Sequence, residues 1–468
     1  MVFSSTVFLF CFLPAVLLIY YIVPFRAKNI SLLIFSLLFY WWNKPSYIFL
    51  ILLSITINYL GGILLSRIGK KRIRRITLIC ILTANIGLLI IFKYTDFIIT
   101  TVNQITHGNI ALTGIILPVG ISFYTFQGMS YIIDIYRNTC SCCKNPLDTA
   151  LYISLFPQLV AGPIVKYNEI HDQINKRHVT ISDFSDGIIR FIIGLSKKVL
   201  IANVLGETAD AIFGLNPSGI DTPTAWIGII CYTFQIYYDF SGYSDMAIGL
   251  GKMFGFSFPE NFNYPYISKS VTEFWRRWHI SLSTWFRDYI YIPLGGSRSG
   301  NTSLHILIVF FITGLWHGAS WNFVIWGMWY GVLLVLEKPI MKLSFYKNIP
   351  SFFRWALTML IVIIGWVCFK AETLPAAWAY IMSMAGIGNV SPEAAHFSYI
   401  YYLDRRLIFS VICAAVCSIP IWKNHFTKLC QNNIWVRIIQ LILVFTLFFI
   451  CIIYITNNVY NPFIYFQF

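Results

Sequence analysis

The chain has 468 residues, of which 57% are hydrophobic, 18% are aromatic and only 11% are charged. A typical soluble domain carries about 25% charged residues, so this chain could not cover a water-facing surface with polar groups. Its mean hydropathy of +0.69 also excludes a disordered chain, a collagen and a disulfide-dense secreted scaffold. The composition predicts an all-α polytopic membrane protein, because the sequence lacks the short alternating segments of a membrane β-barrel.

Lys and Arg outnumber Asp and Glu by 34 to 19, which gives a formal net charge of +15. On a soluble protein this excess would suggest nucleic acid, but the cytoplasmic loops of membrane proteins collect Lys and Arg anyway. We therefore expect a lipid bilayer and no nucleic acid as partner. Most cysteines lie in apolar runs, and only Cys140, Cys142 and Cys143 cluster in a loop. No second cluster has zinc spacing, so we expect no metal, and the cluster has no assigned role.

Five apolar runs follow one another at the start of the chain. Residues 1–25 are uncharged and lack a cleavage site, so they predict a retained first span. Cations follow the first, third and fifth runs, and residues 67–75 hold six cations in nine positions. By the positive-inside rule these ends are cytoplasmic and the N-terminus is outside. Runs two to five are residues 30–42, 45–66, 76–92 and 110–133.

The middle of the chain is more irregular. Residues 147–164 are apolar, but Pro157 and the Gly162-Pro163 pair argue against a straight span and predict a re-entrant or interfacial segment buried within protein. Residues 303–336 carry no formal charge over 34 residues, which is too long for one span, and Gly314 and Gly318 could mark a bend. Further spans are predicted at residues 187–206, 224–250, 353–369, 407–422 and 438–456.

Altogether we expect roughly 10–12 crossings and two or three short in-plane helices in a single domain, residues 1–468. The sequence shows no internal repeat, which disfavours a secondary transporter.

His279 lies in an amphipathic segment, residues 268–292. On one helix, His279 falls between an apolar and a charged face, next to Trp275 and Ser283. Such a helix would lie along the membrane–water boundary with Trp at headgroup depth. His279 then either anchors lipid headgroups or serves an active site. The apolar face holds Phe274, Trp278, Leu282, Trp285 and Tyr289, and the charged face includes Glu273, Arg276, Arg277, Arg287 and Asp288.

His317 lies deep in the uncharged run, between Trp316 and Gly318. Gly314 and Gly318 form a GxxxG pair, which lets another backbone approach closely. The residue is either a core histidine bonded to a carbonyl or a catalytic base, since imidazole titrates near neutrality and can act without carrying charge into the membrane.

A triad of Ser281 or Ser283 with His279 and Asp288 can also be written. The Gly-x-Ser-x-Gly turn and the strand context of such hydrolases are absent from the sequence, so this interpretation is disfavoured.

Seven blocks of sequence share the pattern of one family. They are Leu117–Gln127, Phe156–Ile164, Asp239–Asp245, Phe258–Tyr266, Glu273–Gly296, Gly314–Gly318 and Asn461–Phe468. Together they strongly resemble the membrane-bound O-acyltransferases, the MBOAT family, and within it the bacterial branch that O-acetylates alginate and peptidoglycan. The resemblance is specific over the motif-rich region, about residues 115–340, and weak elsewhere.

The resemblance implies a ring of tilted helices, with re-entrant and in-plane helices, around a tunnel that links the two membrane faces. It implies acetyl transfer from a cytosolic thioester, expected to be acetyl-CoA, in the bacterial cytoplasmic (inner) membrane. The acceptor would be an alginate-like exopolysaccharide, peptidoglycan or cellulose, reached directly or through a periplasmic or extracellular acetyltransferase. No bound cofactor is expected. A transporter or flippase, or a non-catalytic scaffold of an envelope-polysaccharide machine, is the alternative.

The resemblance also assigns site residues. His317 maps to the family's near-invariant histidine and would be the general base, and His279 maps to the second active-site histidine. His279 would orient the acyl group or serve a second proton path. Asp239 and Asp245 would line the site or pair with cations. The other expected substrate and tunnel residues are Trp275, Arg276, Arg277, Ser283, Trp316 and Asn322.

Overall fold

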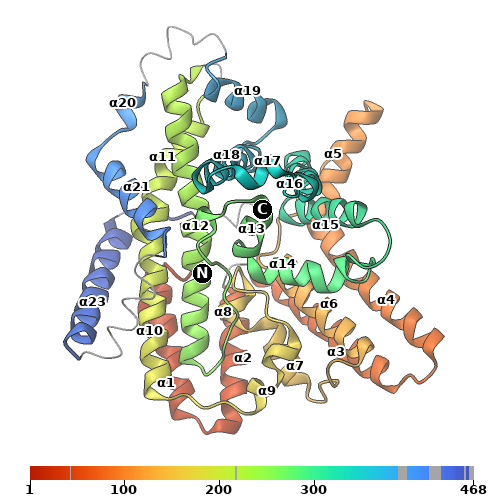
Figure 1. Cartoon of the computed structure of the whole chain (residues 1–468). Coiled ribbons are helices and arrows are strands. Elements are labelled where there is room, and N and C mark those ends of the chain that lie inside the picture. Colours follow the sequence, from red (N-terminus) through yellow and green to blue (C-terminus); the bar gives the residue numbers. More distant parts are fainter. Residues whose placement is uncertain (43, 217–218, 388–397, 421–433, 458–459, 463–468) are drawn as a thin grey trace. The chain divides into compact units, whose positions relative to one another are not determined.

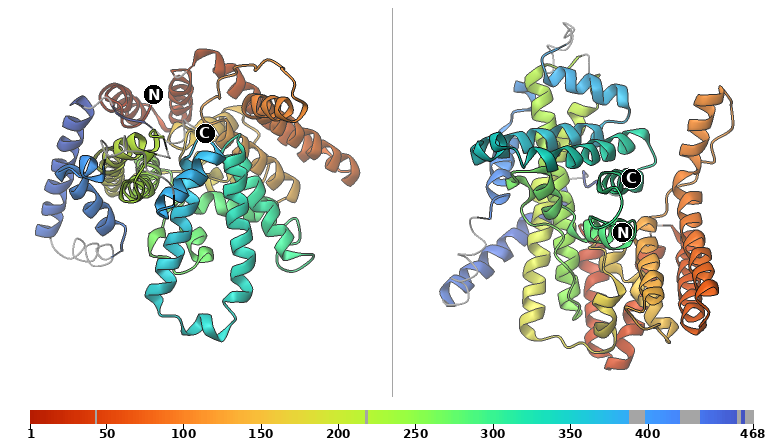
Figure 2. Two further views of the ribbon diagram at one scale, coloured as in Figure 1. Left: turned by 90° about the horizontal axis from the view of Figure 1, so that it is seen from above. Right: turned by 45° about the vertical axis from the view of Figure 1, so that its right-hand side comes forward.

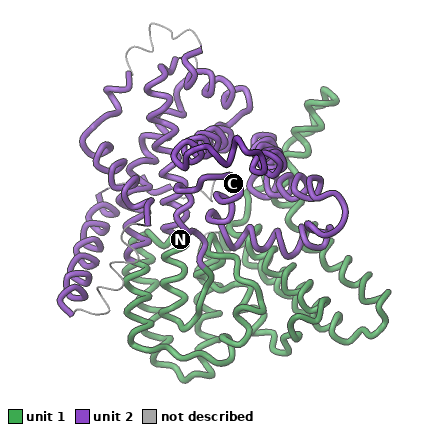
Figure 3. Tube along the Cα trace, in the orientation of Figure 1, with its two compact units in different colours: residues 1–191, 244–259 green, residues 192–243, 260–468 purple. Residues whose placement is uncertain are grey.

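Figure 1 shows the computed structural model of the chain, in which every element among the described residues is helical. The structure describes residues 1–468 except 43, 217–218, 388–397, 421–433, 458–459 and 463–468. The predicted all-α fold is confirmed. The chain divides into two compact units (Figure 3), and the prediction of a single domain stays a prediction. The first unit comprises residues 1–191 and 244–259, and the second comprises residues 192–243 and 260–468.

In the first unit, α3 (Ile48–Arg67), α4 (Lys71–Leu89) and α6 (Ile121–Arg137) pack on one another. Asn58 of α3 and Asn85 of α4 exchange side-chain hydrogen bonds of 3.0 and 3.2 Å, which satisfies two amides inside an apolar contact. The unit also contains α1 (Leu13–Ile22), α2 (Phe25–Trp41), α5 (Thr95–Thr106), α7 (Pro146–Ser154), α8 (Phe156–Leu159), α9 (Tyr167–Asn175) and the start of α10 (Ile181–Ser196).

The fifth apolar run becomes helical later than the sequence predicts. Residues 110–120 are not helical, and α6 begins only at Ile121. Pro118 has no N–H to donate, and Gly120 adopts the left-handed φ of +77°, so neither continues a helix. The predicted run over residues 110–133 is therefore wrong in its first half.

Residues 147–164 form short buried pieces rather than a straight helix. α7 and α8 meet at Leu155, which is not helical, and the Phe156 N–H donates to Ser36 Oγ at 3.1 Å. Residues 151–165 are all buried. The predicted burial within protein is confirmed, whereas a re-entrant path through the membrane stays a prediction.

The second unit holds the later helices. They are the end of α10, α11 (Asn203–Phe213), α12 (Thr222–Met253, which ends in the first unit), α13 (Val271–Arg277), α14 (Ile280–Phe286), α15 (Thr302–His317), α16 (Trp321–Ile340), α17 (Ser344–Asn348), α18 (Ser351–Lys370), α19 (Leu374–Met384), α20 (Tyr399–Tyr402), α21 (Arg405–Cys417) and α23 (Ile434–Asn457).

Residues 268–292 do not form one helix, so that prediction is wrong. α13 ends before Trp278, and α14 begins after His279, whose φ of +44° is left-handed. Hydrophobic periodicity cannot show such a break, because the apolar residues on both sides still point inward. Trp278 and Trp285 are 3% and 1% exposed. The segment is therefore buried in the second unit, and these tryptophans do not face lipid headgroups.

The uncharged run of residues 303–336 divides into α15 and α16, and the predicted bend is confirmed. Gly318 ends α15, and a Cβ added to Gly314 would lie under 3.0 Å from Phe323 O. The two helices therefore form a tight hairpin at a glycine contact. Figure 2 shows α16 and α18 side by side, joined by α17.

Five helical stretches among the described residues are long and apolar enough to cross a membrane, and two shorter apolar stretches accompany them. This is the pattern of a multi-pass membrane protein, although the count of 10–12 crossings stays a prediction. The five are Pro45–Arg67, Lys71–Thr106, Trp321–Ile340, Ser351–Lys370 and Ile434–Asn457, and the shorter two are Phe8–Ile22 and Thr302–His317.

The orientation predicted by the cations can be tested by labelling. Gly69→Cys, in the loop after α3, should react in intact cells with a membrane-permeant maleimide but not with an impermeant one. An added side chain there meets no atom within 4 Å, so access is not limited by packing. Ile110→Cys, on the opposite predicted face and 53% exposed at the native residue, should react with both reagents. Reaction of Gly69→Cys with the impermeant reagent would reverse the orientation, and the wild-type chain gives the background.

Candidate active site

His317 forms the last turn of α15 and is 5% exposed. Three aromatic rings surround it, with centroid distances of 4.9 Å to Trp316, 5.0 Å to Trp326 and 5.4 Å to Phe369. The imidazole therefore lies in a cage of aromatic rings.

His279 is held at the junction of α13 and α14. Asn261 fixes this junction, since its Oδ1 accepts hydrogen bonds from the Ser281 N–H at 3.2 Å and from Ser281 Oγ at 2.9 Å. His279 is 1% exposed, and its ring centroid lies 4.6 Å from that of Phe240. Neither ring nitrogen has a hydrogen-bond partner among the described residues. A left-handed non-glycine residue costs roughly 1–3 kcal/mol and is typical of functional sites.

The two predicted histidines belong to one cluster. Trp316 contacts both, with centroids 6.1 Å from His279 and 4.9 Å from His317. Burial, and after it the electrostatic effect of His317, holds the pKa of His279 well below its ordinary value. This lowered pKa favours the neutral imidazole, the form that can accept a proton.

Indole donors lie beside this pair. Trp326 contacts His317, and its ring lies 5.7 Å from Trp275 and 6.1 Å from Trp366. The indole N–H groups of Trp275 and Trp326 are buried and find no acceptor among the described residues. Buried donors without acceptors are costly, and these two can bind an oxygen of a substrate.

A cavity of about 320 Å³, called the smaller cavity below, opens on one side of the cluster. Of the predicted tunnel residues, Trp275, Arg276 and Ser283 line it. Arg277 does not line it. Its guanidinium group instead forms an ion pair with the Glu273 carboxylate, with Nη2 2.9 Å from Oε1. The other lining residues are Thr272, Leu282, Phe286, Arg287, Tyr291, Ile306, Val309, Phe310, Thr313, Leu334 and Lys338.

A second cavity of about 670 Å³, called the larger cavity below, reaches Phe369, which contacts His317. Its charged residues, Asp210, Lys370 and Glu372, escaped the sequence analysis. Asp210 lies 160 positions before Lys370, yet their side chains meet at 2.5 Å. The other lining residues are Phe213, Gly214, Leu215, Ser320, Phe323, Ala371, Ala376 and Tyr380.

The two cavities lie toward different ends of the α15–α16 hairpin. The smaller one contacts α15 over residues 306–313 and α16 at Leu334 and Lys338, near the open end. The larger one contacts Phe323 of α16 and Ser320, the residue just before this helix, beside the turn. His317 ends α15 at this turn, next to the larger cavity through Phe369 and one helical turn beyond Thr313 of the smaller one.

The remaining predicted site residues have structural partners. Asp239 pairs with Lys198 at 2.7 Å inside the second unit, and Asp245 pairs with Arg190 at 2.5 Å inside the first. Of the two roles left open for these aspartates, the structure shows pairing with cations. Asn322 Nδ2 donates to Ala371 O at 2.6 Å, which ties the start of α16 to the wall of the larger cavity.

Residues near the C-terminus also pack into the second unit. The Tyr460 hydroxyl donates to Asp210 Oδ2 at 2.5 Å, and Asn461 contacts the Asn203 amide at 3.2 Å. Pro462 O accepts a hydrogen bond from Lys198 Nζ.

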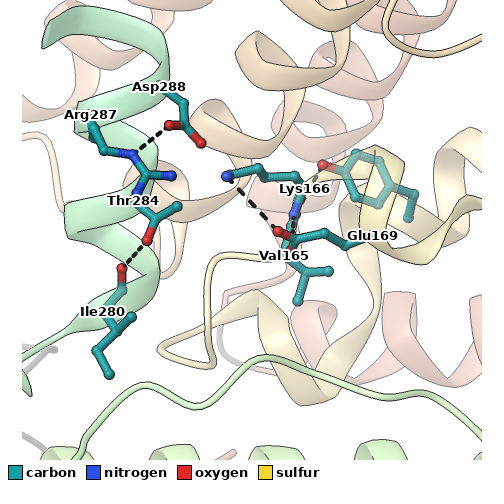
Figure 4. Close-up of polar contacts among 8 residues, drawn as sticks. Val165, Lys166, Glu169, Ile280, Thr284, Arg287 and Asp288 are labelled. Carbon is teal, nitrogen blue, oxygen red and sulfur yellow. Dashed lines mark hydrogen bonds and ion pairs between the residues drawn. The ribbon is translucent and has the colours of Figure 1, made fainter. Parts of the chain in front are cut away.

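Figure 4 shows polar contacts between residues close together in the sequence. Thr284 Oγ1 donates to Ile280 O at 2.8 Å in α14, and Arg287 Nε donates to Asp288 Oδ1 at 2.8 Å in the short π-helix Arg287–Tyr291. In the first unit, Lys166 Nζ lies 3.9 Å from Glu169 Oε1. Ser281 Oγ bonds to an asparagine and not to His279, so the disfavoured serine triad gains no support.

Cys140, in the cysteine cluster, is held as an unreactive thiol. Burial, and after it Asp134, raises the pKa of the Cys140 thiol to about 12, which keeps it protonated. Cys143 Sγ donates to Asn145 O at 3.2 Å. Within the described part of the chain, no group of three or more His, Cys, Asp or Glu residues could hold a metal ion.

The sequence is similar to several known proteins. The family model "MBOAT, membrane-bound O-acyltransferase family" matches residues 144–374. A probable alginate O-acetylase AlgI of Pseudomonas aeruginosa is 44% identical over 83% of this chain and 76% of its own length. The AlgI protein of Pseudomonas putida is 40% identical over 100% of both chains. A peptidoglycan O-acetyltransferase of Helicobacter pylori is 34% identical over 100% of this chain and 98% of its own.

Proposed function

Because the chain belongs to the membrane-bound O-acyltransferase family, we propose that it passes an acetyl group from cytosolic acetyl-CoA across the membrane for O-acetylation of a cell-envelope polysaccharide. The chain is an O-acyltransferase and a multi-pass membrane protein. Relatives named as alginate and peptidoglycan O-acetyltransferases support acetyl as the group and an envelope polymer as the final acceptor. The bacterial cytoplasmic membrane, with the N-terminus outside, is the proposed location.

One observation carries the proposal: two buried histidines contact the same tryptophan, and two cavities reach aromatic neighbours of this cluster, the smaller one at Trp275 and the larger one at Phe369. A donor and an acceptor could then approach the same cluster through different cavities. A scaffold would not need such a site. A transporter would need a continuous path for a whole substrate, whereas here only a two-carbon group has to pass His317.

In this scheme His317 removes the proton from the accepting hydroxyl. The hydroxyl oxygen attacks the thioester carbonyl, the carbon–sulfur bond breaks, and His317 returns the proton to the leaving thiolate. General base catalysis supplies about 10²–10⁴-fold. His279 orients the acyl group or serves a second proton path, and Trp275 or Trp326 can donate to the carbonyl oxygen as negative charge develops there.

The smaller cavity has the chemistry expected of a binding site for acetyl-CoA, the donor. Its wall is apolar around Trp275 and Phe310, and Arg276, Arg287 and Lys338 add three cations to its lining. Moving one charge to the bilayer centre costs at least about 2.5 kcal/mol, so the coenzyme A phosphates would remain at the cytosolic edge, where cations attract them. Only the thioester end then needs to reach the histidines.

The larger cavity suits the acceptor. With about 670 Å³ it can hold a short segment but not a polymer chain. We therefore favour a hand-off, in which a separate extracellular acetyltransferase accepts the acetyl group and modifies the polysaccharide.

Sidedness tests the proposal. The protein is reconstituted in proteoliposomes of known orientation, and labelled acetyl-CoA is supplied to one face only. The acceptor is a mixture of unacetylated alginate, peptidoglycan or cellulose fragments, and an extracellular extract supplies the partner enzyme. The label should reach these fragments when the donor is on the cytosolic face and the acceptor is on the other face. Equal transfer with both substrates on the outer face would refute the vectorial scheme.

A further inference from the structure

The larger cavity has an unbalanced charge. Lys370 Nζ meets Asp210 Oδ1 at 2.5 Å, so these two side chains neutralise each other. Glu372, the third charged residue of the lining, is exposed and forms no ion pair or hydrogen bond with any residue that the structure describes. The lining therefore carries one net negative charge at neutral pH.

The neighbouring side chains do not neutralise the net negative charge of the lining. Lys370 Nζ also lies 5.4 Å from the ring centroid of Tyr232, but its ion-pair partner is Asp210. Asp210 Oδ2 is occupied by the Tyr460 hydroxyl at 2.5 Å. The residues that α16, its N-cap and α19 contribute to the lining are uncharged, namely Ser320, Phe323, Ala376 and Tyr380.

We propose that Glu372 makes the larger cavity a charge filter that admits an uncharged hydroxyl-bearing group and excludes an anionic chain. This inference rests on the proposed function, and it specifies which acceptor can reach His317. A uronic acid polymer carries one carboxylate on each ring, and these like charges are repelled by Glu372. Such a polymer would then be acetylated only after the acetyl group has left on a neutral carrier.

The electrostatics of the cavity can be measured without any transfer activity. Ala376→Cys places a thiol in its lining, at a half-buried residue of α19 whose native side chain makes no polar contact. Two methanethiosulfonates of similar size, one with a sulfonate and one with a quaternary ammonium group, report the local potential through their modification rates, each corrected by its rate with a free thiol. Mass spectrometry of the peptide separates this thiol from the native cysteines.

The cationic reagent should react roughly tenfold faster than the anionic one, the size expected for one nearby unit charge under partial screening. The preference should disappear with Glu372→Gln and reverse with Glu372→Lys. It should persist with Asp172→Lys, a matched charge reversal at a residue outside the lining whose side chain is 98% exposed. An unchanged ratio in Glu372→Lys would overturn the charge filter.

Acceptor choice is then tested with two matched probes, a neutral glucose disaccharide and the corresponding uronic acid disaccharide, with labelled acetyl-CoA as donor. The wild type should favour the neutral probe at least tenfold at low salt, and the preference should shrink in high salt and in Glu372→Lys. Equal use of both probes by the wild type would overturn the selective role. The expected labelling ratios without transfer to either probe would refute the proposed direct acceptance while leaving the electrostatic result intact.

Discussion

Replacing His317 by alanine is expected to reduce O-acetylation in cells to 1% of wild type or less. General base catalysis contributes about 10²–10⁴-fold, and no other side chain in the aromatic cage around His317 offers a base. The measurement is the acetyl ester content of the purified polysaccharide, with the amount of membrane-inserted protein determined in parallel.

His305→Ala is the matched control, because His305 is also a buried histidine of α15. Its Nδ1 lies 3.0 Å from Gly296 O, so it holds a loop and contacts neither cavity. This variant should keep most of the acetylation. Wild-type acetylation by a well-expressed His317→Ala variant would eliminate the catalytic role.

Gly314→Ala is expected to lower the melting temperature of the detergent-solubilised protein by several degrees and to abolish activity. The added Cβ would lie under 3.0 Å from the backbone oxygen of Phe323, so α15 and α16 must separate. Overpacking of this kind costs about 1–3 kcal/mol. The separation would also move His317 away from Trp326, which is on the opposing helix. Size-exclusion chromatography after graded heating gives the melting temperature.

Gly87→Ala controls for the substitution itself. Gly87 lies in α4, and a Cβ there meets no atom within 4 Å. Since alanine is a better helix former than glycine by about 1 kcal/mol, this variant should be as stable as the wild type or more so. Gly327→Ala, which brings a Cβ against Phe310 O in the same hairpin, should repeat the Gly314→Ala result. Equal melting temperatures for Gly314→Ala and Gly87→Ala would contradict the prediction, because they would show that the hairpin accommodates the added Cβ at no cost in stability.

Local features of this fold could be predicted from the sequence because each depends on a short segment. The bend near Gly318 follows from a run too long for one span, and His317 stands out as a titratable group in that run. The break at His279 could not be predicted, because the apolar residues on both sides are all buried and so keep a helical spacing. Pro118 and Gly120 did carry a signal for the late start of α6, which hydropathy alone overlooks.

The larger cavity could not be predicted for a different reason. Asp210 and Lys370 come from helices far apart in the sequence, and each looks like an ordinary charge at the end of an apolar segment. Only the fold places them in one wall. Asp239 shows the converse, since a carboxylate in an apolar run suggests a site, whereas in the structure it pairs with Lys198 at 2.7 Å.

The contacts of residues 460–462 have a consequence for biosynthesis. Lys198, Asn203 and Asp210 meet partners that lie 264, 258 and 250 positions later in the chain. At about 5–20 residues per second, a ribosome delivers those partners roughly 10–50 s after it has synthesised α11. During this delay Asp239 can already neutralise Lys198, but Asp210 waits for both Lys370 and Tyr460. The polar contacts of Asp210 beside the larger cavity are therefore complete only after Tyr460 has been synthesised, and until then its second carboxylate oxygen lacks this partner.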